Sequence, residues 1–240
     1  MLDNLKHLME YVPHDGFSMH AKNALDQLTD NMGELAIENH APHELMFLYD
    51  VAFGRWNNNM HVDGHIIQSG VHRGATLSIL GLAAEQNKSP FLVYGLDPYR
   101  NPKEDDGWKY NQEENYLYVR DIVEKMNLND RVCVCCFDSA NYCKRLPSAF
   151  PVRMIFIDSN HTVPQINAEL AYMESLLNSG GWLVFHDVFH TKLPEFSNAI
   201  ETWILNNQDR YVRWLRLRKY PREGHEHSWV PMSIVACRKK

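Results

Sequence analysis

Five short apolar runs follow one another from residue 61 onward, and stretches with helical periodicity separate them. The runs cover residues 65–68, 91–96, 132–137, 154–157 and 182–185. Strands that are apolar throughout, separated by about 10 to 15 residues of helical pattern, are typical of a parallel sheet buried between helices. The pattern therefore predicts an α/β fold with right-handed crossover connections.

One helix is predicted in detail between the fourth and fifth runs. Thr162 and Gln165 have the spacing of a capping box, and Pro164 lies in the first turn. Gly180 and Gly181 suggest that the helix ends there, because glycine commonly follows the last helical turn. The apolar residues at helical spacing are Ile166, Leu170, Met173 and Leu177.

The C-terminal part of the chain follows a different pattern. Residues 211–217 and 229–237 both alternate apolar and polar side chains, and only residues 218–228 lie between them. This connection is too short for a crossover helix, so the two strands must pair antiparallel. We predict a Rossmann-like sheet of seven strands, mostly parallel, with an antiparallel last strand. The connecting loop then opens onto the carboxyl edge of the sheet, where ligands bind in such folds.

The first 60 residues show helical spacing instead. Apolar residues lie three or four positions apart in two groups, which are Leu5, Leu8, Met9 and Val12, and then Leu45, Leu48, Val51 and Ala52 after Pro42. Two such helices are too few to form a core of their own. We expect residues 1–60 to form a helical cap, in a position to close over the site of a domain that spans residues 61–240.

Composition narrows the class of protein. The chain has 240 residues, of which 45% are hydrophobic, enough for one full core. With 24 basic and 30 acidic residues its net charge is −6, which argues against nucleic acid or an anionic membrane as partner. No apolar run approaches the about 20 residues that span a bilayer, and the first residues lack a secretory signal pattern. Together with the odd number of cysteines, 5, these features predict a soluble, cytoplasmic protein.

The turn after the first apolar run contains candidate ligand-binding residues. Gln68 ends the run, and Gly70 and Gly74 follow four residues apart, with a helix beginning near Gly74. Glycine allows a ligand to approach the backbone, and the free amides of a helix start favour an anionic group. The dinucleotide pattern G-x-G-x-x-G is absent. Taken alone, the two glycines favour a plain tight turn over a binding site.

Two aspartates strengthen the case for a nucleoside ligand. Asp97 ends the second run, and a carboxylate at the tip of the neighbouring strand can accept both hydroxyls of a ribose. The alternative for Asp97 is a solvated turn residue before proline. Asp138 follows the third run, where it could accept the exocyclic amine of an adenine or cap the next helix. The three positions together favour the nucleoside interpretation.

The fourth and fifth runs carry the most specific motifs. The fourth ends in Ile157-Asp158-Ser159-Asn160-His161, and residues 180–187 read G-G-W-L-V-F-H-D. These motifs resemble the class I S-adenosylmethionine-dependent methyltransferases over roughly residues 60–240. The resemblance is greatest to the subgroup that acts on small molecules, whose fourth strand carries the I-D-x-x-H pattern.

The resemblance implies S-adenosylmethionine as cofactor. It implies that Gly70 and Gly74 frame the methionine end, that Asp97 holds the ribose, and that Asp138 with Ser139 meets the adenine. The cofactor-binding set that it implies is Gln68, Gly70, His72, Gly74, Asp97, Asp138, Ser139 and Asp158. Gln68 departs from the family, which commonly has an acidic residue there. An amide cannot offer a full negative charge to the sulfonium, but it can accept a hydrogen bond from the amino group.

Two roles are open for the residues that end the fourth and fifth strands. In related oxygen methyltransferases, aspartates placed like Asp158 and Asp187 hold Mg²⁺, which lowers the pKa of the acceptor hydroxyl. A third ligand usually follows, but the next residue here is Val188. Alternatively His161 or His186 acts as general base, and His161 is the preferred candidate. His161 could also serve only to fix the turn before Thr162.

These expectations lead to a predicted function with two alternatives. We predict a methyltransferase that moves a methyl group in line from S-adenosylmethionine to a hydroxyl of a small molecule. One alternative is a non-catalytic binding protein that kept this fold, which Gln68 and Val188 favour. The other is a nicotinamide-dependent oxidoreductase. The absence of the dinucleotide pattern argues against it. Homo-oligomerisation stays open.

Two loops at the predicted edge are candidates for selecting the acceptor. They span residues 98–110 and 218–228, and both are charged and aromatic. The second carries a basic set that would suit an acidic or phosphorylated acceptor, although a solvated hairpin tip is the simpler interpretation. The set consists of Arg218, Lys219, Arg222, His225 and His227.

Overall fold

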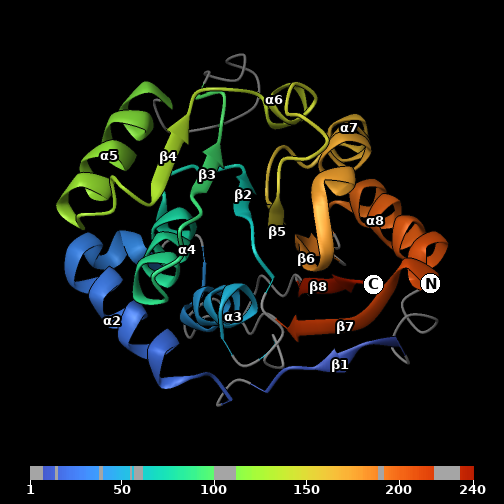
Figure 1. Cartoon of the computed structure of the whole chain (residues 1–240), viewed down its shortest axis with the longest axis horizontal. Helices are drawn as coiled ribbons and strands as arrows, with labels where there is room; N and C mark the ends of the chain where they lie inside the picture. Colours follow the sequence, from blue (N-terminus) through green and yellow to red (C-terminus); the bar gives the residue numbers. More distant parts are fainter. Residues whose placement is uncertain are drawn as a thin grey trace.

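The sheet is the central element of the computed structural model, which describes residues 8–13, 16–37, 40–54, 56, 62–99, 112–188, 192–218 and 233–240. Eight strands follow the order β1-β7-β8-β6-β5-β2-β3-β4. Helices α2 to α5 cover one face and α6 to α8 cover the other (Figure 1). The predicted α/β class and Rossmann-like arrangement are confirmed.

Five parallel strands form the part of the sheet that the apolar runs predicted. They are β2 (His65–Ser69), β3 (Val93–Leu96), β4 (Val132–Cys135), β5 (Val152–Ile157) and β6 (Leu177–Val188). The last two long strands are β7 (Tyr211–Arg218) and β8 (Ser233–Lys239). Strand β8 runs antiparallel to both β6 and β7, as predicted.

The N-terminal segment adds a strand that the sequence pattern did not predict. Residues Glu10–Tyr11 form β1, which pairs parallel with β7 at the edge of the sheet. The helix expected around Leu8 to Val12 is therefore wrong there, and residues 1–7 lie outside the described part. Tertiary pairing overrides the spacing, because Val12 N donates to Arg216 O and Glu10 pairs with Arg213.

Seven α-helices are described. They are α2 (Met19–Met32), α3 (Pro42–Ala52), α4 (Ala75–Gln86), α5 (Gln112–Lys125), α6 (Ser139–Cys143), α7 (Val163–Met173) and α8 (Pro194–Asn207). Short 3-10 helices follow three of them, at η2 (Gly33–Ile37), η5 (Glu174–Leu176) and η6 (Gln208–Arg210). Among the described residues, no helix has the length and apolarity needed to cross a bilayer.

Helix α7 begins as predicted but ends early. The Thr162 hydroxyl accepts a hydrogen bond from Gln165 N, which confirms the N-cap. The predicted end at Gly180 and Gly181 is wrong, because both glycines lie inside β6. At Gly181 a Cβ would lie 2.9 Å from the Arg153 carbonyl oxygen, so this glycine lets β6 approach β5 closely.

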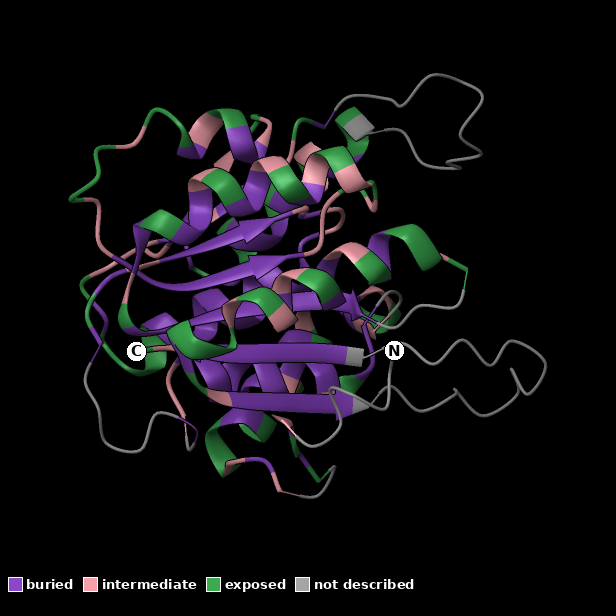
Figure 2. Cartoon of the chain, turned by 90° about the vertical axis from the view of Figure 1, so that its right-hand side faces the viewer, coloured by how far each residue is buried: buried purple, intermediate pink, exposed green. Residues whose placement is uncertain are grey.

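The core has two layers, one on each face of the sheet. Successive strand residues alternate between the layers: Phe156 and Val184 pack towards α2 to α5, whereas Ile157 and Phe185 pack towards α6 to α8. Figure 2 shows the same division, with buried strands and helices exposed only on their outer sides. Helices α2 and α3 share the first layer with α4. The predicted boundary at residue 60 stays a prediction.

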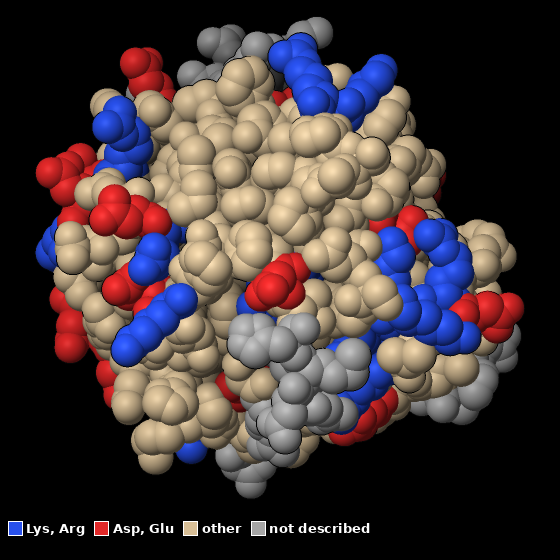
Figure 3. Space-filling model, in the orientation of Figure 1, with Lys and Arg blue, Asp and Glu red and all other residues tan. Residues whose placement is uncertain are grey.

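Charged side chains surround this frame. On the face shown in Figure 3, both signs occur around the periphery, basic side chains gather at the right, and the centre is largely uncharged.

Gly70 gives the first testable prediction, because it has φ +79° and a Cβ there would lie 2.0 Å from the Asp158 carbonyl oxygen. We expect Gly70→Ala to lower the free energy of unfolding by about 3 kcal/mol or more, since backbone strain and overpacking each cost about 1–3 kcal/mol. Gly33→Ala is the matched control, because Gly33 has φ +61° but nothing within 4 Å of the added carbon. If both variants lower the free energy of unfolding equally in chemical denaturation, the contact with Asp158 does not contribute to the loss.

Candidate functional site

The acidic and histidine side chains meet where β5 and β6 end. Ile157 pairs with Phe185 across the two parallel strands, so the residues that follow them lie side by side. His186 Nδ1 is 3.1 Å from Asp158 Oδ1 and 3.2 Å from Asp187 Oδ1. His161 Nε2 is 3.1 Å from Asp187 Oδ2. The structure thus brings together all four residues that the sequence singled out at these strand ends.

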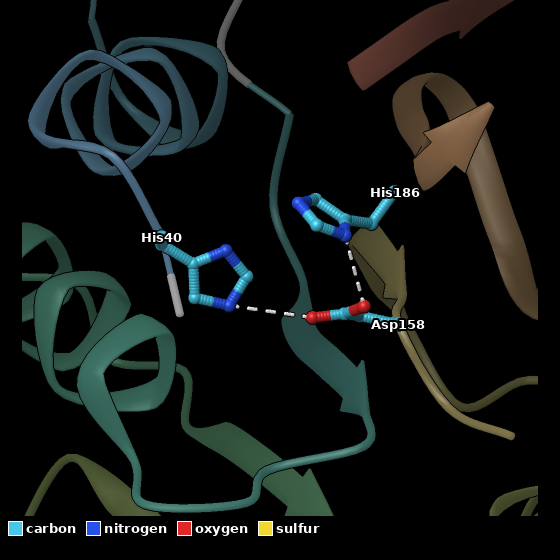
Figure 4. Close-up of side chains that lie close together, drawn as sticks. All are labelled: His40, Asp158 and His186. Atoms are coloured by element: carbon cyan, nitrogen blue, oxygen red, sulfur yellow. Dashed lines mark ion pairs between the residues drawn. The ribbon is translucent and has the colours of Figure 1, made fainter. Parts of the chain in front are cut away.

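Two further residues come from the N-terminal part of the chain, and sequence reasoning missed them. His40 lies just before α3, and its Nε2 is 3.3 Å from Asp158 Oδ2 (Figure 4). Glu44 lies in the first turn of α3, and its Oε1 is 3.5 Å from His186 Nε2. A signal for Glu44 was present, because the helical spacing puts this carboxylate on the same face as Leu48. No local signal pointed to His40.

Burial and charge oppose each other in this cluster. The exposed fraction of the side chains is 6% for His186, 2% for Glu44, 10% for His40, 15% for Asp158, 12% for Asp187 and 29% for His161. Burial opposes ionisation of the carboxyl groups, but the facing imidazolium of His186 outweighs it and holds the pKa of Asp158 and Asp187 below the usual range.

The two carboxylates act on the histidines in the opposite direction. Burial favours the neutral imidazole, yet Asp158 and Asp187 outweigh it and raise the pKa of His186 well above its ordinary value. The pKa of His161 is raised too, because its hydrogen-bonding tendency towards Asp187 and the charge of Asp158 outweigh burial. The cluster therefore favours charged forms although little water reaches it.

The close contacts in the cluster lack hydrogen-bond geometry. Among the described residues, the buried atoms His186 Nδ1, His161 Nε2 and Asp187 Oδ1 have no hydrogen-bond partner of acceptable angle. Asp187 also has φ +53°, a backbone conformation that non-glycine residues rarely adopt. Ion pairs that miss hydrogen-bond geometry, beside a residue in a rare backbone conformation, are typical of a site shaped for a ligand.

Magnesium does not match the donors of this cluster well. Mg²⁺ is bound through oxygen atoms, usually one or two carboxylates and several waters. Here imidazole nitrogens of three histidines lie within 3.8 Å of the two aspartates. The position where a third oxygen ligand was sought is Val188, which is fully buried in the core. The magnesium alternative stays a prediction, and the donor atoms do not favour it.

The glycine turn lies directly beside the cluster. Gly70 and Gly74 both have positive φ, and Gly74 is the left-handed N-cap of α4. His72, between them, has φ +51°. A Cβ built on Gly70 would clash with the Asp158 carbonyl, so the glycine turn and the strand end that carries Asp158 are close neighbours.

Asp97 holds this turn in place. Val71 N and His72 N donate to Asp97 Oδ2 at 2.9 and 3.1 Å, and Tyr99 N donates to Oδ1 at 2.9 Å. The carboxylate thus joins the end of β3 to the turn after β2. Its role towards a ribose stays a prediction.

Gln68 has a buried acceptor without a partner. Gln68 is 1% exposed, and its Nε2 donates a hydrogen bond to Gly70 O at 2.7 Å. A carbonyl oxygen can only accept, so the orientation of the amide is determined and Oε1 faces the other way. Among the described residues, Oε1 has no hydrogen-bond donor. A buried unpaired acceptor is costly, and a ligand amino group would satisfy it.

The residues predicted at the adenine have other contacts. Asp138 caps α6 by accepting a hydrogen bond from Asn141 N at 2.9 Å. Ser139 is buried and donates to Glu169, which also accepts from Ser69 and Gln165. Glu169 was not singled out from the sequence. Contact of Asp138 and Ser139 with an adenine stays a prediction.

The two candidate rim loops lie almost wholly outside the described residues. Residues 100–111 and 219–232 are not described, which includes Lys219, Arg222, His225 and His227. Arg218 is described only as the last residue of β7.

Comparison with known proteins identifies the fold family. A family model described as "Methyltransferase domain" matches residues 67–188, just over half of the chain. The O-methyltransferase from Bacillus cereus, solved in complex with SAH, is 17% identical with a TM-score of 0.58, covering 99% of this chain and 96% of that one.

Two more solved structures have a similar fold. TomG from Streptomyces achromogenes, an O-methyltransferase involved in tomaymycin synthesis and solved with SAM, is 14% identical with a TM-score of 0.59 and covers 90% of each chain. The O-methyltransferase NovP is 12% identical with a TM-score of 0.61, covering 92% of this chain and 99% of that one.

Asp97 and Asp138 accept different numbers of backbone hydrogen bonds, so their contributions to the free energy of unfolding should differ. Asp97 accepts from three backbone N–H groups, whereas Asp138 accepts from one. We expect Asp97→Ala to lower the free energy of unfolding by about 2–3 kcal/mol, since buried donors lose a charged acceptor. Asp138→Ala should cost about 1 kcal/mol, as loss of an N-cap does. A larger loss for Asp138→Ala would contradict the assignment of Asp97 as the residue that holds the turn.

Proposed function

Because the chain belongs to the methyltransferase domain family, whose model matches residues 67–188, we propose that it transfers a methyl group from S-adenosylmethionine to a hydroxyl oxygen of a small molecule. The matched residues include the glycine turn, Asp97, Asp158, His161 and Asp187. Three solved proteins of the same fold are described as O-methyltransferases, and two of them were solved with SAH or SAM.

One observation supports this function above the others. Gly70 packs against the carbonyl of Asp158, so the turn proposed to hold the cofactor adjoins the cluster proposed to manage the acceptor. A cofactor over the turn would therefore present its methyl group at the acidic and histidine side chains. Proximity and alignment of the two reactants are the main requirement of methyl transfer.

Gln68 supports binding of the cofactor's methionine end. Its Oε1 is buried, points away from Gly70 O and has no donor among the described residues. An ammonium group would provide that donor, and such charged hydrogen bonds are stronger than neutral ones. The amide would thereby replace the acidic side chain that the family commonly has at this position.

His161 is proposed as the general base. Its ring is the most accessible of the three histidines in the cluster, with 29% exposed against 10% for His40 and 6% for His186. Its Nε2 faces Asp187, which leaves Nδ1 for the acceptor hydroxyl. Asp187 would orient the imidazole and stabilise its charged form, as the aspartate of a catalytic triad does for its histidine.

The proton and bond changes balance on these groups. S-adenosylmethionine supplies a methyl group that its sulfonium has already activated. As the acceptor oxygen forms its bond to the methyl carbon, the carbon–sulfur bond breaks and the hydroxyl proton moves to His161 Nδ1. The cluster excludes most water, which favours the acceptor over hydrolysis.

Cofactor binding is tested by calorimetric titration with S-adenosylhomocysteine. We expect micromolar-range binding by the wild type and a roughly 10- to 100-fold weaker Kd for Gln68→Met, because one hydrogen bond to a charged group is lost. The control is Gln86→Met, at the exposed far end of α4. If the wild type does not bind, the cofactor proposal fails. If Gln68→Met binds unchanged, only the role of Gln68 fails.

Catalysis is tested with S-adenosylmethionine labelled in its methyl group and a panel of small hydroxylated compounds. On any compound that the wild type methylates, His161→Gln should lower kcat by about 100-fold or more, as loss of a general base does. Its affinity for S-adenosylhomocysteine should stay unchanged. His20→Gln, at an exposed position of α2, is the control. Full activity in His161→Gln would exclude His161 as the base.

A further inference from the structure

The innermost part of the cluster consists of three side chains from separate segments. Figure 4 shows His40, Asp158 and His186 pointing towards one another, from the start of α3 and from the ends of β5 and β6. His40 Nε2 lies 3.3 Å from Asp158 Oδ2, and His186 Nδ1 lies 3.1 Å from Asp158 Oδ1. The two imidazoles thus flank one carboxylate, one at each oxygen.

Both imidazoles are buried, and apart from their ion pairs with carboxylates three of their four nitrogens make no hydrogen bond to the described residues. His40 is 8% exposed and His186 is 5% exposed. His186 Nδ1 and Nε2 and His40 Nδ1 have no hydrogen-bond partner of acceptable angle among the described residues. One ligand atom from each of the three residues can be chosen so that all lie within 4.8 Å of one another. Such convergence of lone pairs is what a bound cation requires.

We propose that His40, Asp158 and His186 bind a divalent transition-metal ion of the zinc and manganese class instead of Mg²⁺. Two imidazoles with one carboxylate suit Zn²⁺, Mn²⁺ or Fe²⁺, whereas Mg²⁺ is held by oxygen atoms. The proposal concerns the same site as the proposed function, but it rests on the donor atoms and not on methyl transfer.

Glu44 supplies the support that a metal-binding histidine needs. Ligand histidines usually direct their second ring nitrogen at a carboxylate, which fixes the tautomer and the ring orientation. Glu44 Oε1 is 3.5 Å from His186 Nε2, while Glu44 Oε2 accepts a hydrogen bond from Ala41 N at 2.6 Å. The carboxylate is therefore fixed at the start of α3. With the proton of His186 on Nε2, the lone pair of Nδ1 faces Asp158.

The N-terminal segment supplies two residues of this site, His40 and Glu44. Both lie outside residues 67–188, which the family model matches. The N-terminal segment therefore contributes one ligand and one supporting carboxylate that the matched region does not contain. His161 and Asp187 remain available for the proton, since neither belongs to this set of three.

Charge balance favours the same conclusion. Among the described residues, Asp158 and Asp187 have only histidines as ion-pair partners. Two largely buried carboxylates need compensating positive charge, because an unpaired buried charge costs several kcal/mol. A divalent cation provides this charge while the histidines stay neutral. Protonated histidines are the competing explanation, and metal titration distinguishes the two.

The probe for the titration is Co²⁺, whose visible absorption reports nitrogen and oxygen ligands. Wild-type protein is stripped with EDTA, dialysed into metal-free buffer and titrated with CoCl₂, followed by ZnCl₂ or MgCl₂ as competitors. We expect one equivalent of Co²⁺ to bind, Zn²⁺ to displace it near stoichiometry, and millimolar Mg²⁺ to leave it in place. Failure to bind Co²⁺, or equally effective displacement by Mg²⁺, would overturn the proposal.

Variants then identify the ligands. His40→Ala should weaken Co²⁺ binding by more than tenfold, and Glu44→Gln by about 10- to 100-fold, because supporting residues typically contribute that much. His20→Ala, on the exposed side of α2, should bind Co²⁺ like the wild type. An unchanged Co²⁺ spectrum and affinity in His40→Ala would refute the assignment even if His186 variants do not fold.

Failure of this proposal is distinguishable from failure of the proposed function. Titration with S-adenosylhomocysteine in the presence of EDTA measures cofactor binding alone. Binding of the cofactor without any Co²⁺ uptake would overturn the metal site and leave the methyltransferase proposal standing. Co²⁺ binding that depends on His40, without cofactor binding, would support the metal site and overturn the methyltransferase proposal.

Discussion

The register of three neighbouring parallel strands is the constraint on which the site depends. Ser69 of β2 pairs with Ile157 of β5, and Ile157 pairs with Phe185 of β6. The residues that follow, Gly70, Asp158 and His186, therefore lie at the same level, although β6 itself continues to Val188. A slip of one residue in any pair would turn the site residues to the opposite face of the sheet. The apolar layers on both faces hold the register, because each strand buries alternate residues against different helices.

Burial of charge is the second constraint, and it links the N-terminal segment to the strand ends. Asp158, Asp187 and Glu44 are largely buried, and histidines lie against each of them. Helix α3 is held on the first core layer by Leu45 and Leu48, which places Glu44 and the preceding His40 at the site. The same packing that completes the core therefore also completes the donor set.

A network of polar side chains extends from the site along the carboxyl edge of the sheet. Asp97 joins β3 to the glycine turn through backbone N–H groups, and Glu169 of α7 joins Ser69 to Ser139. Through hydrogen bonds, these two acceptors connect the ends of β2, β3 and β4. Polar networks of this kind restrict the geometry, because hydrogen bonds between buried groups are costly to break. The ligand-facing residues are therefore placed by rigid elements and not by loops.

Much of this arrangement was predictable from local patterns. Apolar runs identified β2 to β6, alternating residues identified β7 and β8, and the short last connection identified the antiparallel pair, because periodicity and connection length are local properties. The I-D-x-x-H and His-Asp motifs pointed to four residues of the cluster through their resemblance to a known family. Strand β1 and the end of α7 were missed, since pairing with β7 and with β5 overrode the spacing. His40 and Glu44 could not be placed, because only the packing of α3 against the core brings them within reach of Asp158 and His186. The packing of α3 also decides which metal ions the donor atoms suit, because it adds the imidazole nitrogen of His40 to the carboxylate oxygens of Asp158.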